Sequence, residues 1–269
     1  MSTPPTTPPS TPPSAPAGAF SLTGRRALVT GASQGLGTDV ARALAAAGAD
    51  LVLSARSPQP LRALAEDVRR EHGVRVAVVP ADLTRAGEVE RLATEALAAF
   101  DGLDVLVNNA GISHPQRVVD VDADTWDLTM AVNLRAPALL GARVGEAMAA
   151  AGRGSIVNVS SLAGTLALAE HYAYSSSKAA LIMATKVLAL ELGPSGVRAN
   201  SVSPTVVMTE MGQRVWGEEA KGAPMLARIP LGRFVEPAEV GSAVVYLASD
   251  AAAMVNGVDL RLDGGFAVA

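Results

Sequence analysis

The sequence predicts a single α/β domain in which helices cover both faces of a doubly wound parallel β-sheet. Short apolar runs rich in β-branched residues recur along the chain, and helical patterns alternate with them. Strands this apolar belong to parallel sheets whose two faces are both buried. A chain of 269 residues with 49% apolar content is long enough to build one such core.

Composition excludes several functional classes. The net charge is only −4 and no basic run is present, so neither nucleic acid nor an anionic membrane is an expected partner. Cysteine is absent, which excludes disulfides and thiolate metal sites, and no metal site is predicted. No signal peptide or membrane-spanning run is recognisable, and the sequence predicts a cytoplasmic protein.

The first 19 residues are predicted to be a disordered tail. Seven of the first sixteen residues are proline, interleaved with threonine and serine, and such a segment cannot build a helix or a core. A passive extension is favoured over docking onto a partner, because no flanking arginine or lysine is present. The ordered domain is expected over residues 20–269.

A glycine-rich turn follows the first expected strand, residues 26–30. Gly31, Gly35 and Gly37 precede a helical pattern that ends at Gly48. Glycines let the backbone bend sharply and approach a pyrophosphate, and the N-terminus of the next helix attracts anions. A tight turn without a ligand is the alternative, but the position between strand and helix favours a dinucleotide site.

The end of the second expected strand, residues 50–55, indicates which dinucleotide binds. A carboxylate there would bind the ribose 2′-hydroxyl of NAD, whereas this chain has Arg56. A guanidinium suits a 2′-phosphate, so the sequence predicts NADP(H), with Ser33 and Ser57 as hydroxyl donors and NAD(H) less favoured. A solvated arginine at a strand end is the alternative.

The alternation continues with a strand at 74–79, a helix at 87–100 and a strand at 103–107. Polar residues follow both strands, namely Asp82 and the segment 108–111. They lie where open α/β sheets bind ligands, beyond the carboxyl ends of the strands. Asp82 is equally suited to accept from an adenine amino group and to cap the next helix.

A polar amide, Asn133, interrupts the apolar helical segment 125–150. Asparagine is a mediocre helix residue, and at a buried position it indicates a hydrogen-bonding task. A core amide satisfied by its neighbours is the alternative.

Residues 155–178 combine a short buried strand with three chemically active side chains. A hydroxyl, at Ser160 or Ser161, lies at the strand's carboxyl end, and Tyr174 and Lys178 share one face of the next helix. A phenol with a pKa of about 10 is a poor acid at neutral pH. An ammonium about 4 Å away is worth roughly 4 kcal/mol at a dielectric of 20, so Lys178 is predicted to lower the Tyr174 pKa. A packed tyrosine beside a solvated lysine is the alternative.

The last third is predicted to continue the alternation around one long insertion. A helix to 193, a strand at 197–202, a helix at 237–248 and a strand at 259–262 are expected. The stretch 205–236 is loop-rich and carries Met211 and Trp216, so it is predicted to act as an apolar lid over a substrate. Ordinary packing of these apolar residues is the alternative.

Taken together, these residues resemble the short-chain dehydrogenases/reductases of the classical type over 20–269, which implies a Rossmann-type fold. The motifs that carry the resemblance are TGASQGLG at 30–37, NNAG at 108–111, Asn133, Ser161, Tyr174, Lys178, and Pro204 with Thr209.

The resemblance implies a catalytic tetrad. Tyr174 would act as acid and base, Ser161 would orient the carbonyl, and Lys178 would hold ribose hydroxyls and lower the Tyr174 pKa. Asn133 would fix a water in a proton relay. Ser161 matches the family by its separation from Tyr174, and Ser160 does not.

The resemblance also implies the cofactor site, in which Val207 and Thr209 bind the nicotinamide carboxamide. Thr205 departs from the usual glycine after Pro204. The residues assigned to the cofactor are Gly31, Ser33, Gln34, Gly35, Leu36, Gly37, Arg56, Ser57, Asp82, Leu83, Asn109, Ala110, Gly111, Tyr174, Lys178, Pro204, Val207 and Thr209.

Two stretches, 204–216 and 228–234, look like those of dicarbonyl/L-xylulose reductases. This likeness implies an NADPH-dependent reductase of sugar, polyol or dicarbonyl-like substrates, a homotetramer, and a substrate pocket lined by His171, Met211 and Trp216. Gln34 stands where that subgroup has a basic residue, which leaves Arg56 as the main phosphate ligand.

Two alternatives are kept. A 3-oxoacyl-carrier-protein reductase would have to dock an acidic carrier, but Ser195 stands where that group has a basic residue beside Gly196. A noncatalytic NADP(H) sensor would keep the fold without the reaction, and the intact tetrad speaks against it.

Overall fold

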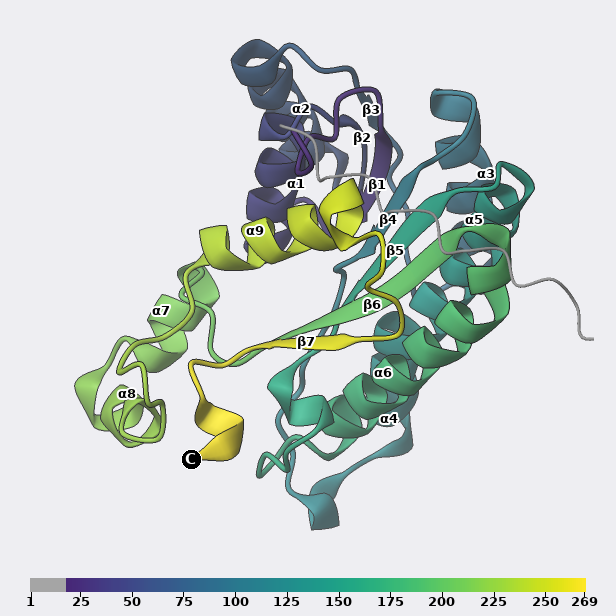
Figure 1. Cartoon of the computed structure of the whole chain (residues 1–269). Helices are drawn as coiled ribbons and strands as arrows, with labels where there is room; N and C mark the ends of the chain where they lie inside the picture. Colours follow the sequence, from purple (N-terminus) through teal and green to yellow (C-terminus); the bar gives the residue numbers. More distant parts are fainter. Residues whose placement is uncertain (1–17) are drawn as a thin grey trace, which may run out of the picture.

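The protein folds around one parallel β-sheet (Figure 1). The computed structural model describes residues 18–269, without the side chains at positions 211, 214, 215, 219 and 221. The strand order is β3-β2-β1-β4-β5-β6-β7, and every pairing is parallel. The strands are β1 (Arg26–Thr30), β2 (Asp50–Ser54), β3 (Val76–Val78), β4 (Val105–Asn108), β5 (Gly154–Val159), β6 (Val197–Pro204) and β7 (Asp259–Leu262). The predicted doubly wound, Rossmann-type fold is confirmed.

Helices cover both faces of this sheet. They are α1 (Leu36–Ala46), α2 (Pro58–His72), α3 (Ala86–Ala99), α4 (Ala123–Met130), α5 (Ala136–Ala150), α6 (Tyr172–Leu192), α7 (Glu210–Trp216), α8 (Glu219–Leu226) and α9 (Pro237–Ala248). Figure 1 shows α1, α2 and α9 on one side, and α3, α5 and α6 on the other. No helix within 18–269 combines the length and the apolar character that crossing a membrane requires.

Two hydrophobic cores result, one on each face. In β1, Ala27 and Val29 pack with α1, α2 and α9, whereas Leu28 packs with α3 and α5. All three side chains are fully buried. A strand whose alternate residues enter different cores must be apolar throughout, which explains the continuous runs in the sequence.

The order of the strands reverses between β1 and β4. From β1 the sheet continues in one direction through β2 and β3, and from β4 it continues in the opposite direction through β5, β6 and β7. The loops that leave β1 and β4 therefore diverge, and ligands of open α/β sheets bind in the crevice between such loops.

Three local features differ from the predictions. The structure adds α2, which begins at Pro58 and carries mostly polar residues. The helical segment 125–150 is divided by a π-helical turn, Ala131–Arg135. The stretch 205–236 contains α7 and α8, which stand out from the sheet near the C-terminus (Figure 1). Most of the predicted tail, residues 1–17, lies outside the described part of the chain.

Candidate active site

The glycine-rich turn is clasped by the end of β4. The Thr30 hydroxyl accepts from the backbone N–H groups of Asn109 and Ala110, at 3.1 and 3.2 Å. The Asn109 amide in turn donates to the Thr30 carbonyl at 3.0 Å. These bonds fix the loops after β1 and β4 against each other. The Asn109 side chain thus helps to shape the glycine-rich turn, residues 31–37, which is called the glycine cradle below.

Two glycines in this turn have no room for a side chain. Gly31 has a φ of +69°, and a Cβ there would lie 2.8 Å from the Ala110 Cα. A Cβ on Gly37 would overlap the Gly31 carbonyl oxygen. Gly35, which precedes α1, instead faces open space. The turn is therefore closely packed at Gly31 and Gly37, and it is open at Gly35, next to the start of α1. This shape fits a pyrophosphate at a helix N-terminus.

Arg56 and Asp82 lie together beyond the ends of β2 and β3. Asp82 accepts from the Thr84 N–H at 3.0 Å and from the Thr84 hydroxyl at 2.8 Å. These bonds, together with the charges of Arg56 and Arg85, hold the Asp82 pKa below its usual range. The structure places Arg85 at the N-cap of α3, so Asp82 forms a turn before that helix and does not cap it.

Lys178 lies buried at the carboxyl end of β5. Its Nζ donates to the Val159 carbonyl at 2.8 Å, and the Ser160 hydroxyl donates to the Lys178 carbonyl at 3.0 Å. The two adjacent serines therefore differ. Ser160 anchors α6 to β5, whereas the Ser161 hydroxyl accepts from the Ala163 N–H at 3.2 Å and lies close enough to the Tyr174 phenol to lower its pKa.

The predicted lowering of the Tyr174 pKa by Lys178 is not seen. Burial raises the pKa of the phenol, and the hydrogen bond with Ser161 offsets this only in part. The Lys178 Nζ lies 5.7 Å from the centre of the Tyr174 ring and is bonded to Val159. Burial also lowers the Lys178 pKa to about 8, so the amine loses its positive charge at a lower pH than a free lysine does.

Asn133 lies in the π-helical turn and is fully buried. Its Oδ1 accepts from the Ile112 N–H at 2.9 Å, and its Nδ2 donates to the Ile112 carbonyl at 2.9 Å and to the Ser177 hydroxyl at 3.1 Å. The side chain thus holds the loop after β4, and a Cβ on Gly111 in that loop would lie 3.4 Å from the Lys178 Nζ. Turns of this type are frequent at functional sites.

The three side chains assigned to the substrate pocket have different surroundings. His171 directly precedes α6, its ring centre lies 6.0 Å from that of Tyr174, and its Nδ1 is 2.7 Å from the Ala169 carbonyl oxygen. Trp216 packs against a small cluster that contains Leu162. The Met211 side chain lies outside the described residues. His171 and Tyr174 are therefore brought together.

The remaining assigned residues lie at the same end of the sheet. Pro204 is the last residue of β6, and Val207 forms a bridge with Val235. The Thr209 hydroxyl accepts from the Gly212 N–H at 3.2 Å and caps α7. Leu83 is buried in the core, while Gln34 and Ser57 are exposed and Ser33 and Leu36 are partly buried.

Sequence reasoning singled out Asn108 but missed Asn158, Thr185 and Ser177, which also shape this site. A buried chain of bonds runs from the Asn108 Nδ2 to the Asn158 Oδ1, and from the Asn158 Nδ2 to the Thr185 hydroxyl, both at 2.8 Å. Ser177 links Asn133 to the Tyr174 carbonyl, to which it donates at 2.7 Å. Asn158 pairs in register with Asn108 on the neighbouring strand, so this register was the signal that could have identified it.

The fold and this site define a dinucleotide-binding α/β oxidoreductase, and comparisons with known proteins agree. A family model described as enoyl-(acyl carrier protein) reductase matches residues 31–267. D-threitol dehydrogenase of Mycolicibacterium smegmatis is 41% identical over 93% of this chain and 95% of its own length. Human L-xylulose reductase is 43% identical over 91% and 97%. The chain therefore belongs to the short-chain dehydrogenase/reductase family.

Solved structures agree on the fold. A gluconate 5-dehydrogenase from Beutenbergia cavernae, described as putative and NAD(P)-dependent and solved with bound NADP, superposes with a TM-score of 0.88. It is 36% identical, over 93% of this chain and the whole of its own.

The NAD-dependent glycerol dehydrogenase of Listeria innocua is 35% identical over 93% of this chain and 96% of its own. The relatives thus include proteins described with each nicotinamide cofactor.

Proposed function

We propose that the protein interconverts a ketone and a secondary alcohol on a small sugar or polyol, with NADP(H) as the hydride carrier. The observation that carries this proposal is the cluster of Ser161, Tyr174 and Lys178 beside the glycine cradle. Similarity to D-threitol dehydrogenase and L-xylulose reductases supports the substrate class. The bound nicotinamide supplies the hydride, and the chain supplies the geometry and the proton.

Tyr174 acts as the proton donor to the carbonyl oxygen during reduction. The Ser161 hydroxyl, which lies near the phenol, binds the same carbonyl oxygen in this mechanism. Because burial raises the Tyr174 pKa, the phenol is protonated at neutral pH, as a general acid must be. Alcohol oxidation requires the phenolate instead, so it should speed up as the pH rises toward the alkaline range.

Lys178 acts beside Tyr174 as a buried hydrogen-bond donor. Its Nζ lies close to the backbone of Gly111, in a loop assigned to the cofactor, and one of its protons goes to Val159. Its other protons are directed to the ribose hydroxyls in this proposal. Asn133 holds the Gly111 loop in place through Ile112.

Arg56 supports NADP(H) over NAD(H). It is exposed at the end of β2, where the cofactor's 2′-substituent is read, and its charge acts on Asp82. A planar guanidinium matches a phosphate, whereas Asp82 alone would repel one.

Replacing Arg56 tests this cofactor assignment. Arg56→Asp should reverse the ratio of kcat/KM for NADPH over that for NADH, because it removes the phosphate ligand and adds a ribose acceptor. Arg143→Asp makes the same charge change on α5, where Arg143 pairs with Glu90, and should leave the ratio unchanged. An unaltered ratio in Arg56→Asp would contradict the assignment.

A substrate panel tests the reaction itself. Pentuloses, tetruloses, diketones and acyl thioesters should be assayed with NADPH and NADH, and the highest kcat/KM is expected for the ketoses. Preference for an acyl thioester would favour the 3-oxoacyl-carrier-protein reductase. Cofactor binding without turnover of any carbonyl would favour a sensor.

The proposed assembly is a homotetramer. α6 exposes Met183, Val187 and Leu190, at 58%, 46% and 77%, and their spacing places them on one helix face. A second copy would cover this apolar stripe. Light scattering should therefore give four times the chain mass, and a monomer at micromolar concentration would contradict this assembly.

A further inference from the structure

A cavity lies at the amino edge of the sheet, opposite the glycine cradle. Its volume is about 410 Å³, within the range of small ligand sites. It is bounded by the first residues of β5 and β6 and by the ends of α6 and α9. Five charged side chains contribute to its lining, namely Arg25, Asp104, Arg153, Arg198 and Asp250.

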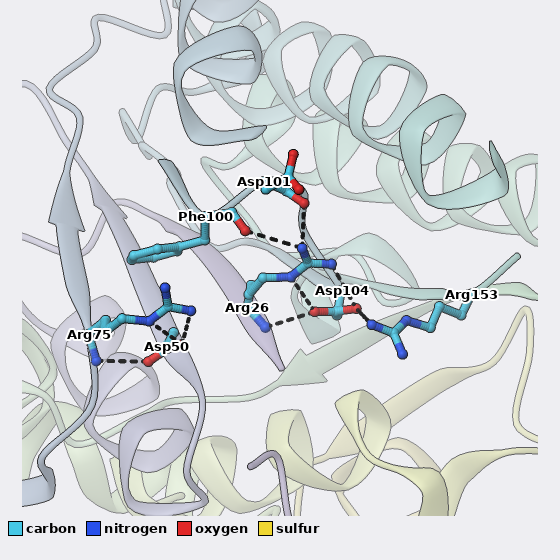
Figure 2. Close-up of polar contacts among 7 residues, drawn as sticks. All are labelled: Arg26, Asp50, Arg75, Phe100, Asp101, Asp104 and Arg153. Carbon is cyan, nitrogen blue, oxygen red and sulfur yellow. Dashed lines mark hydrogen bonds and ion pairs between the residues drawn. The ribbon is translucent and has the colours of Figure 1, made fainter. Parts of the chain in front are cut away.

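One carboxylate in this cavity is shared between two guanidinium groups. Asp104 is buried and accepts from the Arg26 side chain at 2.7 and 3.2 Å and from the Arg26 backbone N–H at 3.0 Å (Figure 2). Arg153 reaches the same carboxylate from the other side, at 2.9 Å (Figure 2). Arg26 alone satisfies Asp104, so Arg153 brings a positive charge that is not balanced there.

Arg198 brings another positive charge to this cavity. It donates to the carbonyl oxygens of Leu247 at 2.7 Å and Ser249 at 3.0 Å, which are neutral acceptors. Within residues 18–269 it has no carboxylate inside 4 Å, and the nearby Asp250 is already bound by Arg25 at 2.9 Å. Burial lowers the Arg198 pKa; the charge of Asp250 opposes this, and the charge of Arg25 adds to it to a smaller extent.

These arginines bring more positive charge than the capping of helix ends requires. Arg198 caps carbonyls at the end of α9, where a cation is favourable. Arg153 has no such task, and its side chain remains 57% exposed at the cavity. Among the residues that line the cavity, the three arginines Arg25, Arg153 and Arg198 lie with two carboxylates, Asp104 and Asp250. One of these, Asp104, is also bound by Arg26, on which the charge of Asp101 acts as well.

We propose that this cavity binds a compact oxyanion of two or more charges, held by Arg25, Arg153 and Arg198. Guanidinium forks match phosphate and carboxylate oxygens in geometry, so inorganic phosphate and a small tricarboxylate share the required chemistry. Such an ion would connect the starts of β5 and β6 with the end of α9. The site stabilises the folded chain and takes no part in hydride transfer.

Isothermal titration calorimetry tests the site directly. Phosphate and citrate are titrated separately at constant ionic strength, with the protein saturated with NADP⁺ so that neither ion enters the glycine cradle. The wild type should bind at least one of them saturably. Arg25→Ala/Arg153→Ala should weaken that binding about tenfold or more, because charge-assisted hydrogen bonds are lost. This variant keeps the bond between Arg26 and Asp104, and the only carboxylate that it leaves without an arginine is the solvent-exposed Asp250. It is therefore expected to fold.

A matched control is Arg117→Ala/Arg143→Ala, which removes two exposed arginines whose partners, Asp120 and Glu90, lie elsewhere. Its affinity for the ion should equal that of the wild type. The melting temperature of the wild type should also rise with the logarithm of ion concentration, and that of the cavity variant should not. The tighter ligand identifies the source. No saturable heat for either ion, or equal affinity in all three proteins, would overturn the proposal.

Discussion

The two edges of the sheet treat buried polar groups in opposite ways. At the amino edge, Asp104 lies buried but is bonded from several directions by Arg26 and Arg153 (Figure 2). At the carboxyl edge, several buried side-chain oxygens have no hydrogen-bond partner among the described residues. Four of the five such atoms lie at or directly after strand ends or in the first turn of α6, namely those of Ser54, Asn108, Ser175 and Thr205. The fifth, Asp259 Oδ2, lies at the start of β7.

The difference separates stability from chemistry. A buried polar atom without a hydrogen bond costs about 1–3 kcal/mol, so a fold keeps such atoms where a ligand completes them. At the amino edge, the Asp104 carboxylate is instead satisfied by groups of the chain itself. Removing Asp104 should therefore destabilise the fold, and disturbing the carboxyl edge should stop the reaction in a folded protein.

The largest effect on folding is expected from Asp104→Ala. It leaves the largely buried Arg26 guanidinium without its carboxylate, which should cost about 3–5 kcal/mol of unfolding free energy in urea. Asp120→Ala removes a similar bond to Arg117 on the surface, where solvent screens the pair, and should change the unfolding free energy far less. Turnover per folded molecule should stay unchanged in both variants. Equal losses of stability would remove the contrast between buried and exposed pairs.

The pH dependence of the Asp104 contribution sharpens the same point. Burial alone would raise the Asp104 pKa, but the hydrogen bonds from Arg26 hold it below its usual range. For an acid with a lowered pKa in the folded state, the stabilisation is present above the unfolded pKa and is lost as the pH falls through the folded one. The gap between wild type and Asp104→Ala should thus stay constant from pH 7 to about 5 and close under more acidic conditions.

A smaller effect is expected from Lys178→Met. Burial lowers the Lys178 pKa to about 8, so the folded state releases its proton before the unfolded state does. Wild-type stability should therefore rise between pH 8 and 9.5, by about 2 kcal/mol relative to the variant. Urea unfolding of both proteins at pH 7 and 9.5 measures this. A difference that stays constant with pH would show that Lys178 is not desolvated.

Much of the fold was predictable because its signals are local. Strands buried on both faces had to be apolar, and the glycine turn had to accept positive φ at Gly31. Helix α2 was missed because its polar surface and its prolines at positions 58 and 60 do not resemble an apolar helix. The prolines instead occupy the first turn, where no backbone donor is needed.

The site was predictable in its chemistry and less so in its electrostatics. Ser161, Tyr174 and Lys178 lie together because a strand end and a helix start carry them. The π-helical turn at Asn133 depends on tertiary contacts with Ile112 and Ser177, which no spacing encodes. The Tyr174 pKa was predicted wrongly because the sequence showed the charge of Lys178 but not its burial, nor its bond to Val159.

The most direct test of the account is Tyr174→Phe. Titration of the variant by cofactor fluorescence should give the wild-type Kd for NADPH, because the phenol oxygen is needed for the proton and not for the glycine cradle. Its kcat/KM for the best ketose should fall by about 10² to 10⁴-fold. Retention of wild-type turnover by a variant that binds NADPH normally would contradict the account.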